Sequence, residues 1–228
     1  MESSSKKNLC LQPNQQTNRS LHFIEAEKRA CIPFLHYKQL ECDWHSQVYT
    51  IHDHDITLRI PEGAIPVGKK IRFEIAVVMY GPFIFEENMW PISPILWLCF
   101  KEDIPLDKPF QVILPHFLVG LTKEKALYHQ VTFAKATHSE HFIEDGQLKY
   151  SFKPCTAEPY YASSGGKSYG VLVTKHCCFY CLQAKHTPEL VKDASYCLSR
   201  IESKLDQHRS EIYFSATFFL STCLKVLV

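Results

Sequence analysis

A turn rich in proline and glycine, placed between two segments of alternating hydrophobicity, most strongly constrains the fold of this chain. Ile56, Leu58 and Ile60 share one face, and the same period of two recurs over residues 70–79. The turn between them reads Ile60-Pro61-Glu62-Gly63-Ala64-Ile65-Pro66-Val67-Gly68. Its prolines cannot donate to a ladder and its glycines accept positive φ, so it is predicted to be a shaped corner between two half-buried strands.

Short strands separated by turn signals continue along the chain, as is typical of a sandwich or open barrel. They are expected at residues 56–60, 70–79, 95–100, 110–114, 128–135, 148–152 and 169–182. Residues 95–100 are apolar on both faces, which indicates a central strand covered on both sides. The predicted fold class is mainly β, a β-sandwich or open barrel of short antiparallel strands with one C-terminal amphipathic helix.

Changes in composition and period divide the chain into three segments. Residues 1–40 are rich in Ser, Asn, Gln and Lys without a clear period, and they are predicted to be a disordered tail or linker. Residues 41–184 are predicted to form the β domain. Residues 185–228 are expected to hold a helix, with Thr187 as N-cap and Pro188 at its first position, and then the start of an incomplete second β domain.

Charge and targeting signals argue against several classes of function. The chain has 25 Lys and Arg against 24 Asp and Glu, a balance that favours neither nucleic-acid nor anionic-membrane partners. The N-terminus lacks the apolar run of a signal peptide, and the apolar stretch 214–228 is shorter than the roughly 20 residues of a membrane span. We therefore expect a cytoplasmic protein without direct membrane insertion, whose ten cysteines are reduced thiols.

Three proline-containing motifs follow one another along the predicted β domain. They are Ile60-Pro61-x-Gly63-Ala64-Ile65-Pro66, Ser93-Pro94-Ile95 and Lys108-Pro109-Phe110-x-Val112-x-Leu114-Pro115-His116. In order and spacing they resemble the ZU-five domain, the module shared by zonula occludens proteins, ankyrins, netrin receptors and the p53-induced death-domain protein. The resemblance covers about residues 45–184.

This resemblance implies a β-rich module for interaction and autoinhibition, with no cofactor and with a death domain often following it. The implied partners are proteins, either neighbouring domains of the same chain or cytoskeletal proteins. Spectrin binding, known for the ankyrin branch, is not carried over, because no basic patch of this sequence matches it.

The same resemblance raises the alternative of self-cleavage. Some members of the family cut themselves within a His-Phe-Ser motif on a late strand, where this chain has His176, Cys177 and Cys178. A Cys178 thiol activated by His176 could attack the carbonyl of Cys177, and water would open the resulting thioester. The competing interpretation is that these cysteines are small apolar residues of a packed strand.

Two other patterns invite a metal-binding interpretation, and neither is adopted. Cys178-x-x-Cys181 would place its thiols on opposite faces of a strand. His52 and His54 would share one strand face, roughly 6.6 Å apart, but no third ligand is identifiable and a polar solvated edge is the simpler interpretation. Ser163–Ser168 lacks the first glycine of a phosphate loop and is followed by a strand-like segment, so no phosphate site is predicted.

An aromatic-rich loop supplies the predicted binding residues, which are Tyr80, Phe83, Phe85 and Trp90. Core packing is the alternative for these rings. The sequence as a whole predicts a non-catalytic intracellular protein–protein interaction module that acts in signalling scaffolds or autoinhibition through its surface and an exposed edge strand. The alternatives are a self-cleaving module cut between Cys177 and Cys178, and a cytoskeletal anchoring module.

Overall fold

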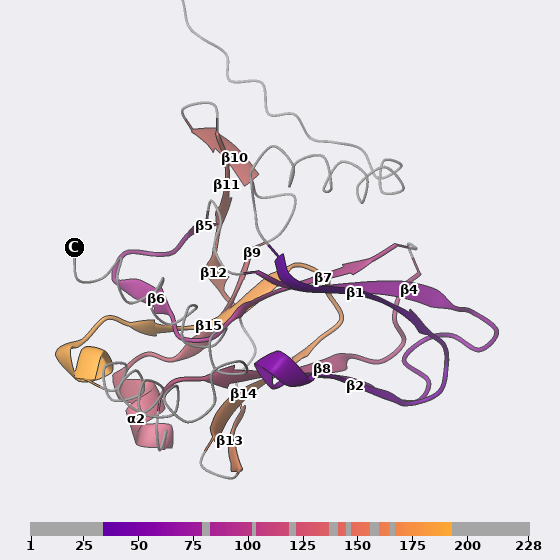
Figure 1. The fold of residues 1–228 in the computed structure, drawn as a ribbon, viewed down its shortest axis with the longest axis horizontal. Coiled ribbons are helices and arrows are strands. Elements are labelled where there is room, and N and C mark those ends of the chain that lie inside the picture. The colour runs from indigo at the N-terminus through magenta and orange to yellow at the C-terminus, as the bar shows by residue number, and fades with distance from the viewer. Residues whose placement is uncertain are drawn as a thin grey trace, which may run out of the picture.

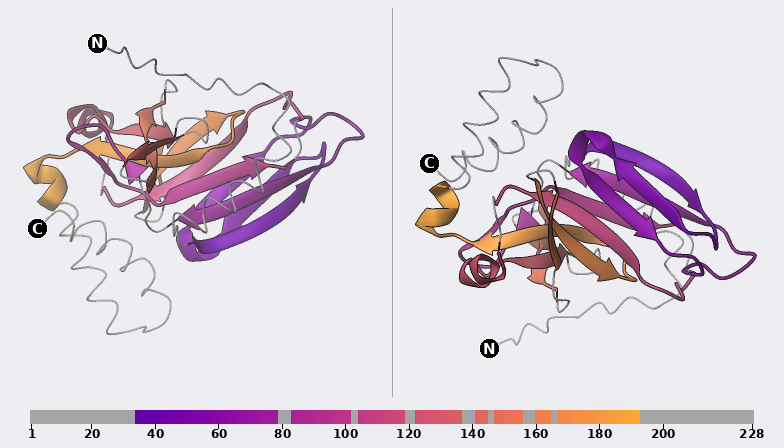
Figure 2. Two further views of the ribbon diagram at one scale, coloured as in Figure 1. Left: turned by 90° about the horizontal axis from the view of Figure 1, so that it is seen from above. Right: turned by 90° about the horizontal axis from the view of Figure 1, so that it is seen from below.

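The computed structural model describes residues 34–78, 83–101, 104–118, 122–136, 141–144, 147–155, 160–164 and 167–192. Their strands form three sheets, and the two larger sheets pack face to face in a sandwich-like layout (Figures 1 and 2). All pairings within these two sheets are antiparallel. The predicted fold class, mainly β with short antiparallel strands, is confirmed.

The seven-stranded sheet contains β1 (Phe34–Cys42), β4 (Ile71–Val78), β7 (Ile95–Phe100), β15 (Phe179–Lys185), β9 (Thr132–Ala136) and β12 (Lys153–Pro154) in that order, with β6 (Met89–Pro91) also paired to β15. The five-stranded sheet contains β13 (Tyr160–Ser164), β14 (Lys167–Thr174), β8 (Phe110–His116), β3 (Ile56–Ile60) and β2 (Gln47–Ile51). The small third sheet contains β10 (His141–Glu144), β11 (Gln147–Ser151) and β5 (Phe83–Ile84). The short helices of the described residues are η2 (His52–His54), α2 (Lys123–Tyr128) and a C-terminal helix at residues 188–192.

The inner core lies between the two large sheets. It is built from the alternating positions of their strands, so Ile56 and Leu58 of β3 and Phe73 of β4 are completely buried. The ring of Phe73 meets Phe110 of the opposite sheet edge to face, with 5.5 Å between ring centroids. Apolar burial from both sheets is therefore the main source of stability for this layer.

A second, outer core covers the other face of the seven-stranded sheet. Trp97 and Phe179 of that sheet pack beneath Phe152 and the rings of Phe83 and Phe85. Residues 95–98 are buried on both faces because β7 lies between the two cores. The expectation of a central strand covered on both sides is therefore confirmed.

The corner at residues 61–68 has the predicted backbone. Gly63 and Gly68 have φ values of 69° and 75°, in the left-handed region that favours glycine. Residues just before β8 hold the corner in place. Asp107 N–H donates to the carbonyl of Ala64 at 2.9 Å, and Lys108 Nζ donates to the carbonyl of Glu62 at 2.8 Å. Two of the three proline motifs thus meet in space.

The remaining motif, Ser93-Pro94-Ile95, supports the central strand β15. Ser93 is buried, and its hydroxyl oxygen accepts the backbone N–H of Leu182 in β15 at 2.8 Å. This contact satisfies a buried donor of that strand. All three motifs therefore have direct structural roles in the sandwich.

Several predicted boundaries are wrong. The tail expected over residues 1–40 overlaps β1, so residues 34–40 belong to the sheet. The strand expected at 128–135 begins only at Thr132, because α2 occupies residues 123–128. The single strand expected at 169–182 is two strands, β14 and β15, separated by a turn at residues 175–178.

The predicted C-terminal helix begins where the sequence placed its cap. Thr187 Oγ1 accepts the backbone N–H of Leu190 at 3.2 Å, and the helix runs from residue 188 through residue 192, the last described position. The remainder of the predicted helix and the second β domain lie outside the described residues. No helix in the described part of the chain combines the length and the hydrophobicity needed to cross a membrane.

Candidate functional site

The predicted self-processing residues lie in the turn between β14 and β15. His176 N–H donates to Thr174 Oγ1 at 3.1 Å, and the His176 carbonyl accepts the hydroxyl of Tyr180 at 2.8 Å. The Thr174 and Tyr180 hydroxyls are themselves 3.1 Å apart. Two buried or half-buried hydroxyls therefore fix the backbone of this turn.

The predicted base, His176, and the predicted nucleophile, Cys178, lie in different environments. His176 is exposed, whereas Cys178 is completely buried and belongs to the inner core. The Cys178 carbonyl accepts Leu98 N–H at 3.1 Å, which extends the ladder between β15 and β7. Burial is the largest cause that raises the pKa of the neighbouring Cys177 thiol well above its usual range. This arrangement suits packing better than proton transfer between the two side chains.

The rings of the aromatic loop pack largely against other residues of the same chain. Phe85 stacks on Phe152 with 4.8 Å between ring centroids and 8° between ring planes, and Phe83 meets Phe179 at 5.1 Å. Trp90 stacks on His186 at 4.4 Å. These three predicted binding residues are half-buried, and Tyr80 lies outside the described residues. The core-packing interpretation therefore describes Phe83 and Phe85 better than a free contact surface.

The histidine pair is not on a strand. His52 and His54 lie in η2, a single turn of 3₁₀ helix, so the expected common strand face does not exist. His54 instead faces His36 of β1, with 6.4 Å between ring centroids. Burial lowers the pKa of His54, and the nearby His36 lowers it further. No group of three or more His, Cys, Asp or Glu side chains within the described ranges is arranged to hold a metal ion.

The serine- and glycine-rich segment forms a hairpin rather than a loop. Strands β13 and β14 pair from Tyr160 opposite Val171 to Ser164 opposite Lys167. A phosphate loop requires a helix after the glycines, and here a strand follows. The strand-like segment expected after Ser168 is therefore part of β14, which begins at Lys167.

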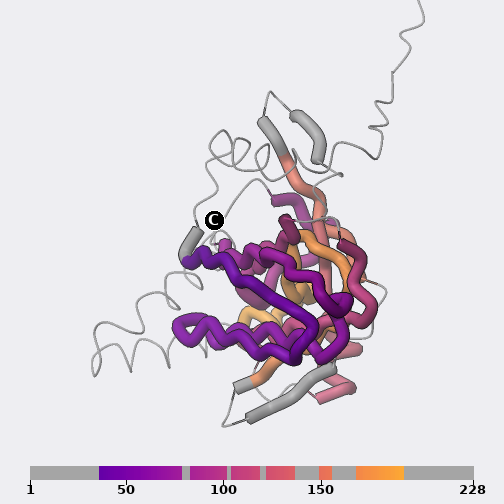
Figure 3. Tube along the Cα trace, turned by 90° about the vertical axis from the view of Figure 1, so that its right-hand side faces the viewer, coloured from indigo at the N-terminus to yellow at the C-terminus, as the bar shows by residue number. Residues whose placement is uncertain are grey.

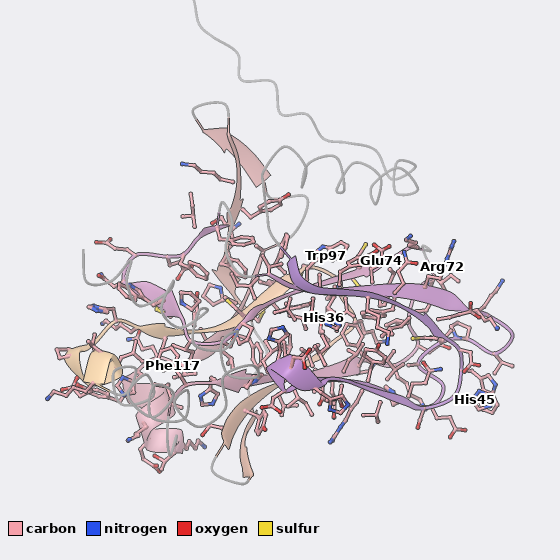
Figure 4. The ribbon with its side chains drawn as sticks, in the orientation of Figure 1. His36, His45, Arg72, Glu74, Trp97 and Phe117 are labelled. Carbon is pink, nitrogen blue, oxygen red and sulfur yellow. The ribbon has the colours of Figure 1, made fainter. Side chains whose placement is uncertain are left out.

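On one side of the sandwich lie the outer edges of β1 and β2, which pair with no other strand among the described residues. These strands are the terminal strands of the two large sheets, and they face the viewer together in Figure 3. Lys38 of β1 lies over the ring of Tyr49 of β2, with its Nζ 5.0 Å from the ring centroid. Figure 4 shows His36 between the two sheets on this side. The two edges therefore approach each other at this contact.

The two edges differ in chemistry. Strand β1 carries Lys38 and Glu41 and has a register irregularity between Phe34 and His36, features that discourage pairing with another strand. Strand β2, Gln47-Val48-Tyr49-Thr50-Ile51, has no charge and no proline. Its Val48 side chain is 66% exposed, so β2 offers an apolar contact beside its backbone groups.

A buried carboxylate anchors β1 to its sheet. Glu74 is 1% exposed, and its Oε1 accepts Tyr37 Oη at 2.8 Å and Gln39 Nε2 at 2.7 Å. Lys101 Nζ lies 2.8 Å from the same oxygen. Glu74 lies on the outer face of the larger sheet in Figure 4, so this network fixes the edge strand on the side opposite the inner core.

The chain matches no protein-family model, and no curated protein matches it. A functional proposal for this chain therefore rests on its own sequence and structure. Among the described strands, that geometry offers an uncharged terminal strand, β2, and a packed turn at the predicted processing residues.

Proposed function

We propose that this chain is a non-catalytic protein–protein interaction module that acts in a signalling scaffold or in autoinhibition, as its resemblance to the ZU-five domain implies. The observation that carries the proposal is the uncharged β2 edge with its exposed Val48. An edge strand presents backbone N–H and C=O groups to an incoming extended segment, and side-chain contacts then select the partner. Protein partners fit this surface better than nucleic acid, since β2 is uncharged.

A pair of matched charge substitutions tests the proposal. Val48→Lys places a charge on the β2 edge, whereas Leu127→Lys places the same charge on another exposed apolar residue, in α2. Proteins captured by the wild-type chain are purified and titrated against all three forms. We expect Val48→Lys to weaken binding by about tenfold, equivalent to about 1.4 kcal/mol, and Leu127→Lys to leave it unchanged.

Hydrogen exchange provides the second readout. Bound partner is expected to slow exchange in residues 47–51, because their outer backbone groups become hydrogen-bonded. Equal binding by both lysine variants, with unchanged exchange in β2, would contradict the proposal.

Self-cleavage between Cys177 and Cys178 is the second candidate. It is favoured by one observation, the Tyr180 hydroxyl that hydrogen-bonds to the His176 carbonyl and holds the turn next to the predicted scissile bond. The exposed His176 and the buried Cys178 argue against it. We therefore rank the interaction module first.

A further inference from the structure

Two histidine rings face each other across the two large sheets. His36 lies in β1, the terminal strand of the seven-stranded sheet, and His54 lies in η2, directly after β2, the terminal strand of the five-stranded sheet. Their ring centroids are 6.4 Å apart and their planes make an angle of 80°, an edge-to-face arrangement. Because β1 and β2 belong to different sheets, no ladder joins them, and side-chain contacts such as this one hold the two edges together.

The backbone of β1 directs His36 toward the other sheet. The register of β1 shifts between Phe34 and His36, and such irregularities re-aim side chains. The next residue, Tyr37, donates to Glu74 at 2.8 Å on the outer face, so His36 lies on the inner face, as Figure 4 shows. The His36 Nε2 atom is buried and has no hydrogen-bond partner among the described residues. A proton on this nitrogen therefore lacks an acceptor until water reaches it.

The charges around His54 also disfavour its protonation in place. Burial is the largest cause that lowers the pKa of His54, and His36 lowers it further, while Asp53 and Asp55 beside it in η2 act in the opposite direction. On β1, Lys38 adds a positive charge two residues after His36, where its Nζ lies over the ring of a β2 residue. The net effect is a lowered pKa, so the uncharged imidazole suits this site.

We propose that His36 and His54 form an acid-sensitive contact, which holds β1 and η2 together while both rings are uncharged and lets them separate when both are protonated. Two positive rings at this distance repel each other. Separation exposes His54 to water and restores an ordinary pKa near 6.5, so the separated form takes up its proton first as the pH falls. The population of the separated form therefore rises below pH 6.5.

This contact has a consequence for the proposed function. Strand β2, the proposed partner edge, leads directly into η2, so separation would release one end of that strand. The consequence rests on the proposed function, whereas the contact itself is measured with no partner present. Failure of one therefore leaves the other standing.

Hydrogen exchange of the full chain at pH 7.5 and pH 5.5 tests the contact, after correction for the intrinsic pH dependence of exchange. His54→Gln removes one ring of the pair. His52→Gln is the matched control, because His52 is an exposed histidine of the same turn. In the wild type and in His52→Gln, we expect exchange in residues 34–42 and 47–56 to rise on acidification relative to β7. The rise should be about threefold if the medium between the rings screens like water, and larger with partial burial. In His54→Gln we expect no such rise.

Titration of the imidazole signals by NMR gives a second readout. His36→Gln should raise the pKa of His54, because it removes a neighbouring positive charge, whereas His52→Gln should leave that pKa unchanged. The exchange test does not depend on this variant, so it stands if His36→Gln does not fold.

Four results would overturn the proposal. They are the absence of any rise in the wild type, an equal rise in His54→Gln, a His54 titration that ignores His36→Gln, and a rise of the same size in β7. The last result would mean that acid loosens the whole sandwich rather than the contact between its edges.

Discussion

The inner and outer cores of this protein use the same central strands and differ in how completely they are covered. The inner core is closed by two large sheets, so Phe73 and Phe110 are fully buried. The outer core is covered by a small sheet and a loop, and Phe83 and Phe85 are only half-buried there. Alternating strand positions supply both cores, but a second large sheet covers the first, whereas a few aromatic rings cover the second.

The largest test of this difference is a pair of equal truncations. Phe73→Ala should cost about 3–5 kcal/mol, because it empties a fully buried site that the opposite sheet cannot fill. Phe85→Ala should cost about 1–2 kcal/mol, because its ring is half-exposed and loses mainly the stack on Phe152. Urea denaturation measures both, and equal losses would mean that the two cores are not distinct in strength.

Acid should weaken the inner core through His116. This side chain shares the face of β8 that holds Phe110, and burial lowers its pKa to about 4. Unfolding exposes the imidazole and restores a pKa near 6.5. As the pH falls, His116 therefore becomes protonated in the unfolded chain before it does in the folded chain. Stability should therefore be unaffected by this group above pH 6.5 and should fall by up to about 3 kcal/mol between pH 6.5 and pH 4.

The control for this pH effect is His116→Gln, which removes the titrating group. The variant should have a flatter profile of unfolding free energy between pH 6.5 and pH 4, measured by urea titration at each pH. An unchanged slope in the variant would show that another group is responsible.

Close approach of the two large sheets at Gly170 gives a third test. A Cβ on Gly170 would lie 2.5 Å from Leu182 Cδ1, and Leu182 is completely buried. Gly170→Ala should therefore cost about 1–3 kcal/mol through overpacking. A double variant with Leu182→Ala should recover part of that loss in thermal or urea unfolding, and simple additivity would contradict the contact.

The smallest expected effect lies where the last described helix begins, beside the inner core. Thr187 caps this helix through its hydroxyl oxygen, which also lies 3.1 Å from His129 Nδ1. Thr187→Ala should cost about 1 kcal/mol, whereas Thr187→Ser keeps the oxygen and should cost much less. Equal losses in the two variants would show that packing of the methyl group matters more than the cap.

The sequence predicted best those elements whose local pattern and tertiary environment agree. Strand β3 and the glycine corner followed directly from alternation and from the need for positive φ. Strand β1 was missed because its inner face includes His36 and Lys38, which obscure the period of two. The turn at 175–178 was missed because the residues on both sides of it are equally apolar, so hydrophobicity gave no boundary.

The candidate site was harder to predict than the fold. Alternating hydrophobicity predicts which face of a strand each residue lies on. It does not predict which strands lie at the ends of a sheet, because strand order depends on long-range pairing. The exposure of Val48 and the stacking of Lys38 on Tyr49 follow from β1 and β2 being terminal strands of different sheets. The burial of Cys178 beside the exposed His176 likewise depends on the position of β15 at the centre of its sheet.

Intact mass under denaturing conditions tests the proposed non-catalytic role most directly. The purified chain is incubated for several days at neutral pH, denatured and weighed, with His176→Ala and Cys178→Ser as references. The account predicts a full-length species alone in all three samples. Paired fragments of the wild type that break between Cys177 and Cys178, and that are lost in both variants, would contradict it and establish self-cleavage.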